Sequence, residues 1–213
     1  MTNLTDEQRH QYYRSKVAQL KLQDQNLKLG LNSDYKIVFD LDYLHLMKPV
    51  EIKSLASQLS YCYSLNKKLK TPFLYHFSNY KDEVKFEMES MGSKNWLAKF
   101  HEEKFYEIEE VMSSGRDIVY LSPDSPEVLK EVDCNSIYVI GGFVDKPVSK
   151  YRSLNKAMGL NIKSARLPLD DFLKDLTNPV LNINNVVEIL GKFMETGDWE
   201  VTLKELIPSR MLK

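Results

Sequence analysis

Short apolar runs alternate with helical patterns along most of this chain, and this alternation restricts the fold more than any other feature of the sequence. The apolar runs lie at residues 35–41, 73–78, 117–122, 136–142 and 164–169. Apolar residues at helical spacing occupy 50–66, 125–132, 183–196 and 198–207. Strands that alternate with helices pair in parallel, because each helix returns the chain to the same edge of the sheet. The sequence therefore predicts an α/β domain with a mostly parallel sheet flanked by helices.

A further helix is expected before this pattern, at residues 5–29. Thr5 and Gln8 have the spacing of a capping box, and Gly30 is a typical stop signal. We expect residues 1–30 to form a helical arm and residues 31–213 to form one domain. Basic residues on such a helix more often form a solvated face than an RNA contact. Residues 81–113 are rich in charge and are not assigned to elements.

The composition excludes several classes of protein. The 4 histidines and 2 cysteines form no CxxC, HxxH or HExxH pattern, so we expect no metal site. No stretch reaches the roughly 18 uncharged apolar residues of a membrane helix, and the acidic, polar start differs from a signal or transit peptide. With 29 Lys and Arg against 30 Asp and Glu, only a local basic face would suit a nucleic acid.

One motif suggests a phosphatase. The apolar run that ends in Asp40-Leu41-Asp42 has the shape of a haloacid-dehalogenase-type loop, in which one aspartate is the nucleophile. Asp170 and Asp171 would then hold magnesium. The Gly and Thr that normally follow are absent, so we interpret Asp40 and Asp42 as a strand end and a cap.

Two basic groups and a diglycine offer another interpretation. Gly141 and Gly142 end an apolar run and precede a lone carboxylate, Asp145, for which a turn role is the commoner use. The first basic group comprises Lys146, Lys150, Arg152, Lys156, Lys163 and Arg166, and the second comprises Lys67, Lys68 and Lys70. If the groups converge, they form a face for phosphates. Asn182 and Asn184 precede a helix and either cap it or hold a polar ligand.

These blocks together resemble a known family. SIYVIGGFVDKP, SLNKA, SARLPL, VLNINNVVEIL and TGDW with IPSR follow the order and spacing of the tRNA purine-nine N1-methyltransferases, a branch of the SPOUT superfamily. The likeness extends upstream through VFDLDYLHLM, EIKSLASQLSYCYSLNKK and VYLSPDS, so it covers about residues 35–210. It implies a parallel sheet with a C-terminal trefoil knot that binds S-adenosylmethionine, and tRNA as the partner. Two departures are Tyr61, where a basic residue is common, and Pro147, where Asn is common.

The resemblance also implies roles for individual residues. Asp145 matches the proposed general base, and Gln58 matches a glutamine near the reacting centre. Lys67 and Lys68 match a basic pair that contacts tRNA, and we place Arg152, Lys156 and Arg166 on the same tRNA face. The cofactor pocket is implied at Leu121, Ser122, Gly142, Lys146, Lys150, Ser153, Leu167, Leu169, Asn182 and Asn184. Pro168 lies between the last two leucines of this set.

The chemistry agrees with a carboxylate base. Guanine N1 carries a proton that must leave as the methyl group arrives, whereas adenine N1 has a free lone pair. Asp145 should therefore contribute more to methylation of guanine than of adenine. The purine that is methylated must leave the tRNA core to reach the site. The alternative hypothesis is a non-catalytic tRNA-binding scaffold of a processing complex, which the presence of Asp145 disfavours.

The resemblance extends to compartment and partners. VFDL, TPFLYHFSN and FVDK resemble the mitochondrial branch, which works beside a dehydrogenase-like protein and a ribonuclease P nuclease subunit, whereas NNVVEIL and ETGDW resemble the nuclear or cytoplasmic branch. We expect a mitochondrial protein with a monomeric catalytic domain.

Overall fold

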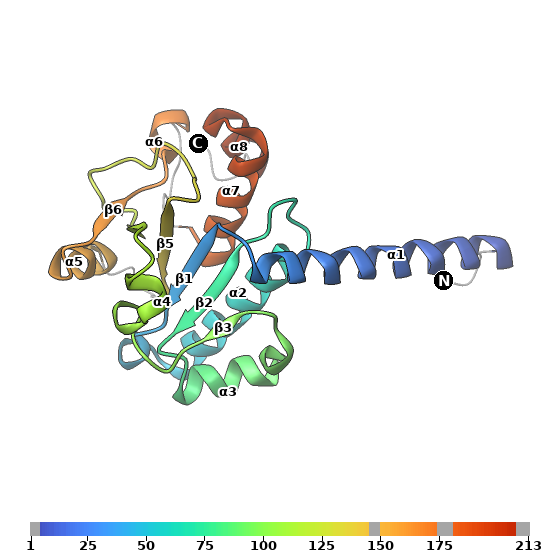
Figure 1. Cartoon of the computed structure of the whole chain (residues 1–213), viewed down its shortest axis with the longest axis horizontal. Helices are drawn as coiled ribbons and strands as arrows, with labels where there is room; N and C mark the ends of the chain where they lie inside the picture. The colour runs from blue at the N-terminus through green and yellow to red at the C-terminus, as the bar shows by residue number, and fades with distance from the viewer. Residues whose placement is uncertain (1–4, 145–149, 174–180, 208–213) are drawn as a thin grey trace.

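The computed structural model describes residues 5–144, 150–173 and 181–207, and a six-stranded sheet forms its centre (Figure 1). The strands are β1 (Lys36–Asp40), β2 (Leu74–Ser78), β3 (Lys99–Phe100), β4 (Asp117–Leu121), β5 (Ser136–Gly141) and β6 (Lys163–Ala165). They lie in the order β3-β2-β1-β5-β4-β6, and every pair is parallel. The predicted parallel α/β sheet is confirmed. The strand β3 lies in the region that the sequence left unassigned.

Helices connect the strands and cover the sheet. The α-helices are α1 (Asp6–Leu31), α2 (Pro49–Asn66), α3 (Asp82–Ser90), α4 (Glu109–Met112), α5 (Arg152–Gly159), α6 (Leu169–Phe172), α7 (Ile183–Thr196) and α8 (Trp199–Leu206). Short 3₁₀ helices lie at Leu44–Leu46, Ser93–Asn95 and Phe105–Glu107. The helices predicted at 5–29, 50–66, 183–196 and 198–207 are confirmed as α1, α2, α7 and α8.

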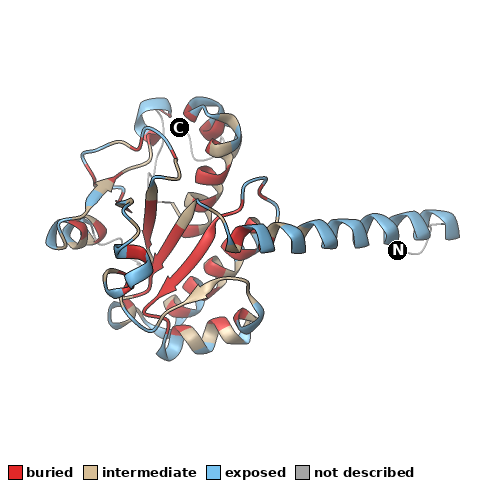
Figure 2. Ribbon diagram, in the orientation of Figure 1, coloured by how far each residue is buried: buried red, intermediate tan, exposed pale blue. Residues whose placement is uncertain are grey.

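The central strands β1, β2 and β5 are buried on both faces, and they are red along most of their length in Figure 2. One face, which includes Ile37 and Phe39 of β1, packs together with Leu41 after the strand against α2, α3, α7 and α8. The other face, which includes Val38 of β1, packs against α4, α5 and the segment around Phe105. Because successive side chains of a strand point to opposite faces, a nearly continuous apolar run such as 35–41 is what a doubly covered strand requires.

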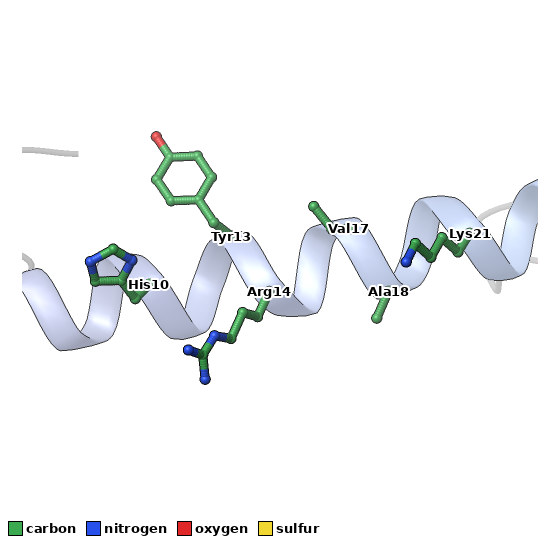
Figure 3. Close-up of a pocket in the computed structure, with 6 residues that line it drawn as sticks. All are labelled: His10, Tyr13, Arg14, Val17, Ala18 and Lys21. Atoms are coloured by element: carbon green, nitrogen blue, oxygen red, sulfur yellow. The ribbon is translucent and has the colours of Figure 1, made fainter.

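The predicted N-terminal helix is confirmed as α1, which extends away from the sheet in Figure 1. Thr5 caps it through the expected capping box with Gln8. Leu27 and Gly30 are its buried residues, near the point where it meets the domain. Figure 3 shows six residues along one side of this helix, His10, Tyr13, Arg14, Val17, Ala18 and Lys21. Because all six belong to one helix, they form an exposed helix face and not an enclosed pocket.

One predicted helix is wrong. Residues 125–132 carry a Ser-Pro start and apolar spacing, yet the structure has no helix there. The segment instead runs beside the end of β6, where Leu129 N donates to Arg166 O (2.8 Å) and Arg166 N donates to Glu127 O (2.8 Å). Hydrogen bonding to this exposed edge satisfies the backbone, and Leu129 becomes buried in the core. The predicted strand at 164–169 is also shortened, because α6 begins at Leu169.

Two further expectations concern the whole chain. The knot stays a prediction, because the connection between α6 and α7 includes residues 174–180, outside the described part. Among the helices that the structure describes, none has both the length and the hydrophobicity to cross a lipid bilayer.

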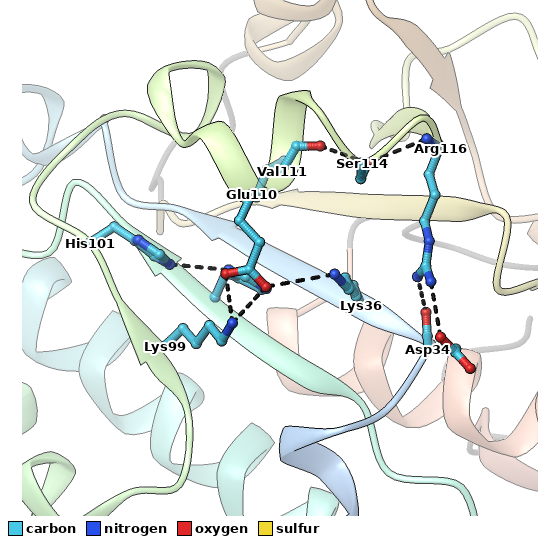
Figure 4. A network of polar contacts seen from close by, with 9 residues as sticks. Asp34, Lys36, Lys99, His101, Glu110, Val111, Ser114 and Arg116 are labelled. Carbon is cyan, nitrogen blue, oxygen red and sulfur yellow. Dashed lines mark hydrogen bonds and ion pairs between the residues drawn. The ribbon is translucent and has the colours of Figure 1, made fainter.

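Charged residues cross-link the sheet on the face that α4 covers (Figure 4). Glu110 of α4 accepts from Lys99 of β3 through both carboxylate oxygens (2.6 Å each) and lies 3.8 Å from Lys36 of β1. Nearby, Arg116, which precedes β4, forms an ion pair with Asp34, which precedes β1 (3.0 Å). The ion pairs of Glu110 therefore tie α4 to two strands of the sheet, β3 and β1.

Candidate functional site

The helices change from one face of the sheet to the other between β1 and β5. α2, which follows β1, packs in the larger core with Ile37 and Phe39, whereas α5, which follows β5, contributes Ala157 to the opposite core. β1 and β5 are neighbours in the sheet. The loops that leave their carboxyl ends therefore diverge, and open parallel sheets bind ligands at such a point.

The segment after β5 lies tightly against the end of β1. Gly142 N donates to Asp40 O (2.7 Å), and a Cβ at Gly142 would lie 2.6 Å from the side chain of Leu41. Only glycine fits this approach without displacing a neighbour. The predicted pocket residue Gly142 thus fixes the start of the segment that follows β5. Asp145 and Lys146 lie outside the described residues, so their roles stay predictions.

The end of β4 meets the start of α5 through two buried hydroxyl groups. Ser153 Oγ donates to Ser122 Oγ (2.8 Å), and both residues are buried. Ser122 N donates to Ala165 O (2.9 Å), which joins β4 to the end of β6. Lys150 is exposed just before α5, and Leu121 is buried at the end of β4. The structure therefore brings Leu121, Ser122 and Ser153 together, as predicted.

A side chain of α2 caps the last long helix. Gln58 Oε1 accepts from Ile183 N at 3.0 Å, which satisfies one of the free amides at the start of α7. Asn182 occupies the cap position without a side-chain cap bond, and Asn184 Nδ2 donates to Asn185 Oδ1 (2.8 Å). Gln58, Asn182 and Asn184 therefore lie close together at the start of α7, although Gln58 and Asn182 are 124 positions apart in the sequence.

These groups fit S-adenosylmethionine in chemical type. Leu169 is buried and Leu167 is partly buried beside the same core, so apolar side chains are available for an adenine ring. The hydroxyl groups of Ser122 and Ser153 and the amide of Asn182 are the kinds of donor and acceptor that a ribose and an amino acid need. Among the described residues, no group of three or more His, Cys, Asp or Glu could hold a metal ion.

A buried charge cluster lies beside this site. The carboxylate of Asp40 is fully buried; Tyr120 Oη donates to Asp40 Oδ2 (2.7 Å), and Lys156 Nζ lies 2.6 Å from the same oxygen. Lys156 also lies 3.3 Å from Asp42 Oδ2, and Lys104 lies 3.2 Å from it. Burial opposes ionisation of Asp42, but Lys156 and Lys104 outweigh it and lower the pKa of Asp42. The sequence interpretation missed this cluster.

The cluster does not match the phosphatase alternative. Asp40 Oδ2 is already engaged by Lys156 and Tyr120, so the carboxylate is not presented as a nucleophile. Asp170 and Asp171 are exposed on α6, which follows β6, and two strands separate β6 from β1. The expected assembly of aspartates is therefore not formed.

The structure does not bring the two basic groups together. Lys67 and Lys68 precede the amino end of β2, whereas Arg166 follows the carboxyl end of β6. Because the strands are parallel, these residues lie at opposite ends of the strands. Lys67 Nζ lies 4.8 Å from the ring centroid of Tyr63, and Arg166 donates to Pro126 O (3.3 Å). Lys68 is exposed and Arg152 is partly buried at the start of α5. Contact of these residues with tRNA stays a prediction.

Comparisons with known proteins agree with this geometry. A family model described as tRNA (guanine(9)-N(1))-methyltransferase TRM10/TRM10A matches residues 2–212. The tRNA (guanine(9)-N1)-methyltransferase of Schizosaccharomyces pombe is 34% identical over 197 residues, which cover 90% of this chain and 64% of that protein. The tRNA methyltransferase 10 homolog A of Rattus norvegicus is 34% identical over 180 residues, 84% of this chain and 53% of that protein.

A solved structure shares the fold. The full-length spTrm10 complex with SAH superposes with a TM-score of 0.75 at 33% identity, and the match covers 83% of this chain and 96% of that one. This chain spans between about half and two thirds of the length of the two curated relatives.

Proposed function

This chain belongs to the TRM10/TRM10A family of tRNA (guanine(9)-N1)-methyltransferases, and from that premise we propose that it methylates N1 of the purine at position nine of tRNA with S-adenosylmethionine. The observation that carries the proposal is the match to the spTrm10–SAH complex over 83% of this chain. The convergence of Leu121, Ser122 and Ser153 at one edge of the sheet supports it.

The chain's own residues supply binding, orientation and proton transfer in this proposal. When bound, S-adenosylmethionine supplies a methyl group on a positively charged sulfur. Asp145 accepts the N1 proton of guanine as the N–C bond forms and the C–S bond breaks, which leaves SAH and a protonated carboxyl group. Gln58 holds the start of α7 through Ile183 N. Gly142 holds the start of the segment after β5 against the end of β1. When the backbone around a site is held in this way, the reacting groups are already oriented, which lowers the barrier to methyl transfer.

Methyl transfer to two tRNA transcripts tests the proposal. The protein is incubated with labelled S-adenosylmethionine and transcripts that differ only in G or A at position nine, with a U9 transcript as the control. We expect label in N1-methylguanine of the G9 transcript, none in the U9 transcript, and a loss of G9 methylation in Asp145→Asn. Methylation of G9 that survives Asp145→Asn would remove Asp145 from proton transfer, whereas methylation of A9 should survive this substitution because adenine N1 carries no proton. No methylation together with no SAH binding would overturn the proposed function.

We propose, on the resemblance of VFDL and TPFLYHFSN, that the protein works in mitochondria beside a dehydrogenase-like protein and a ribonuclease P nuclease subunit. The test is fractionation of cells that express the tagged full-length protein, followed by identification of co-purified proteins. Recovery with the nucleus or cytosol, without these partners, would contradict the proposal.

A further inference from the structure

We propose that Lys156 and Asp40 form a positioning pair, which holds α5 against the end of β1 and thereby keeps Ser153 and Ser122 in place at the cofactor site. The inference rests on the proposed function, because it assigns a role within that site. The sequence places Lys156 in a basic run and predicts that it contacts tRNA. We instead assign it a role inside the protein.

The burial of Asp40 requires a counter-charge. Its side chain has no exposed surface, and it accepts from Tyr120 Oη at 2.7 Å, from Asp42 N at 3.1 Å and from Lys156 Nζ at 2.6 Å. A buried carboxylate without a cation is strongly destabilising, and hydroxyl and amide donors alone compensate it only in part. The ammonium group of Lys156 is therefore committed to Asp40.

Lys156 is enclosed on further sides. Its ammonium lies 3.3 Å from Asp42 Oδ2 and 4.5 Å from the centroid of the Tyr43 ring, and 17% of its side chain is exposed. Tyr43 Oη and Tyr120 Oη lie 2.9 Å apart, which joins the ring to the same cluster. A lysine that binds a tRNA phosphate presents its charge to solvent, whereas this lysine directs it into the protein.

Lys156 and Ser153 act together because they lie on one face of α5. Residues three positions apart are neighbours on a helix surface. Lys156 reaches Asp40 at the end of β1, while Ser153 donates to Ser122 after the end of β4. β1 and β4 are the two strands that flank β5 in the sheet. One helix face therefore bridges both neighbours of β5, whose carboxyl end leads into the loop of Gly142.

This arrangement makes a specific demand on the cofactor site. If the Lys156–Asp40 contact is lost, α5 keeps its apolar packing through Ala157 and its hydrogen bond from Ser153 to Ser122, but it loses the ion pair that ties it to Asp40 at the end of β1. We therefore expect the loss to weaken binding of S-adenosylmethionine and SAH without weakening binding of tRNA.

The experiment compares three variants of the full chain. Lys156→Met alone leaves a buried carboxylate without a counter-charge, so the main test is the double variant Asp40→Asn/Lys156→Met, which buries no net charge. Lys156→Arg keeps the charge and tests for rescue. The matched control is Asp117→Asn/Lys163→Met, which removes a pair of the same chemistry (2.6 Å) that lies exposed between β4 and β6. SAH affinity is measured by calorimetry, tRNA affinity by filter binding, and KM and kcat by methyl transfer, below the unfolding midpoint of each variant.

We expect the Asp40/Lys156 double variant to bind SAH about tenfold more weakly, which corresponds to a loss of about 1.4 kcal/mol in binding free energy. Its KM for S-adenosylmethionine should rise, and its affinity for tRNA should be unchanged. Lys156→Arg should retain most of the SAH affinity, and the Asp117/Lys163 control should keep the wild-type SAH affinity. A folded double variant with wild-type SAH affinity would overturn this inference alone. Weaker tRNA binding with unchanged SAH affinity would overturn it in favour of an RNA contact. A wild-type chain that binds no SAH would overturn the proposed function, and this inference with it.

Discussion

The buried histidine of β2 should make the fold sensitive to mild acid. His76 has no exposed surface, and its Nδ1 lies 3.1 Å from Nε2 of His101, which Figure 4 shows near Glu110. Burial lowers the pKa of His76 from 6.5 to about 3; Glu110 opposes the shift, while His101, Lys99 and Lys36 add to it. Burial also lowers the pKa of His101. Both imidazoles are therefore neutral in the folded protein at pH values where they are protonated in the unfolded chain.

The sign and size of the effect follow from this difference. Because the folded-state pKa lies below the unfolded one, the contribution of His76 to stability is complete above pH 6.5 and falls as the pH drops from about 6.5 to about 3. Each unit in that window costs about 1.4 kcal/mol. Between pH 7.5 and pH 5.0 the loss from His76 is therefore about 2 kcal/mol, or about 4–8 °C in the unfolding midpoint for a chain of this size.

Thermal and urea unfolding at pH values from 5.0 to 7.5 measure this loss. His76→Leu has a similar volume and does not titrate, so its stability should fall by about 2 kcal/mol less than that of the wild type over this range. Groups that do not contact His76 contribute equally to both proteins and cancel in the difference, so the difference reports on His76 together with its neighbour His101. His10→Gln, at an exposed position on α1, should retain the wild-type pH dependence. An equal pH dependence of the wild type and His76→Leu would refute the reasoning.

Two substitutions test the anchors of the candidate site. Gly142→Ala places a Cβ 2.6 Å from the Leu41 side chain, so the rate of methyl transfer should fall about tenfold or more. The control is Gly159→Ala, whose added Cβ meets no atom within 4 Å and which should have wild-type activity. Equal activity of the two variants would contradict the role of Gly142. Gln58→Ala removes the acceptor of Ile183 N, so unfolding measurements should show a loss of about 1–2 kcal/mol together with weaker SAH binding. Unchanged stability of this variant would mean that solvent replaces Gln58 at the start of α7.

The strands were predictable because their sequences satisfy local and tertiary requirements at once. Strand β1 needs apolar side chains on both faces, and the nearly continuous apolar run from Tyr35 to Leu41 supplies them. The capping box of Thr5 is a purely local signal, and it places the start of α1 correctly. Gly142 was recognisable as a position of close backbone approach, although the neighbour it approaches was not.

Long-range pairing explains the failures. The start signal at Ser125 is a good local one, but the edge beside Arg166 offers the backbone of Glu127 and Leu129 hydrogen bonds that a short helix does not provide. The basic run that contains Lys156 predicts a surface for phosphates, because sequence spacing alone does not show that Asp40 lies buried beneath it. The apolar residues before Asp40 were the available signal: a carboxylate that ends a doubly buried strand needs a counter-charge from elsewhere in the chain.

The anchors of the site lie where loops leave the regular elements. Asp40 ends β1, Ser122 follows β4, Gly142 follows β5, and Gln58 meets the first residue of α7. Asp145, the residue proposed for proton transfer, follows Gly142 by three positions in the sequence. A loop whose first residue is fixed to a buried sheet has fewer conformations available to its remaining residues, so orientation of the reacting groups depends on these anchors. Substitutions at an anchor should therefore lower stability and activity together, whereas substitutions at Asp145 should lower activity and leave stability nearly unchanged.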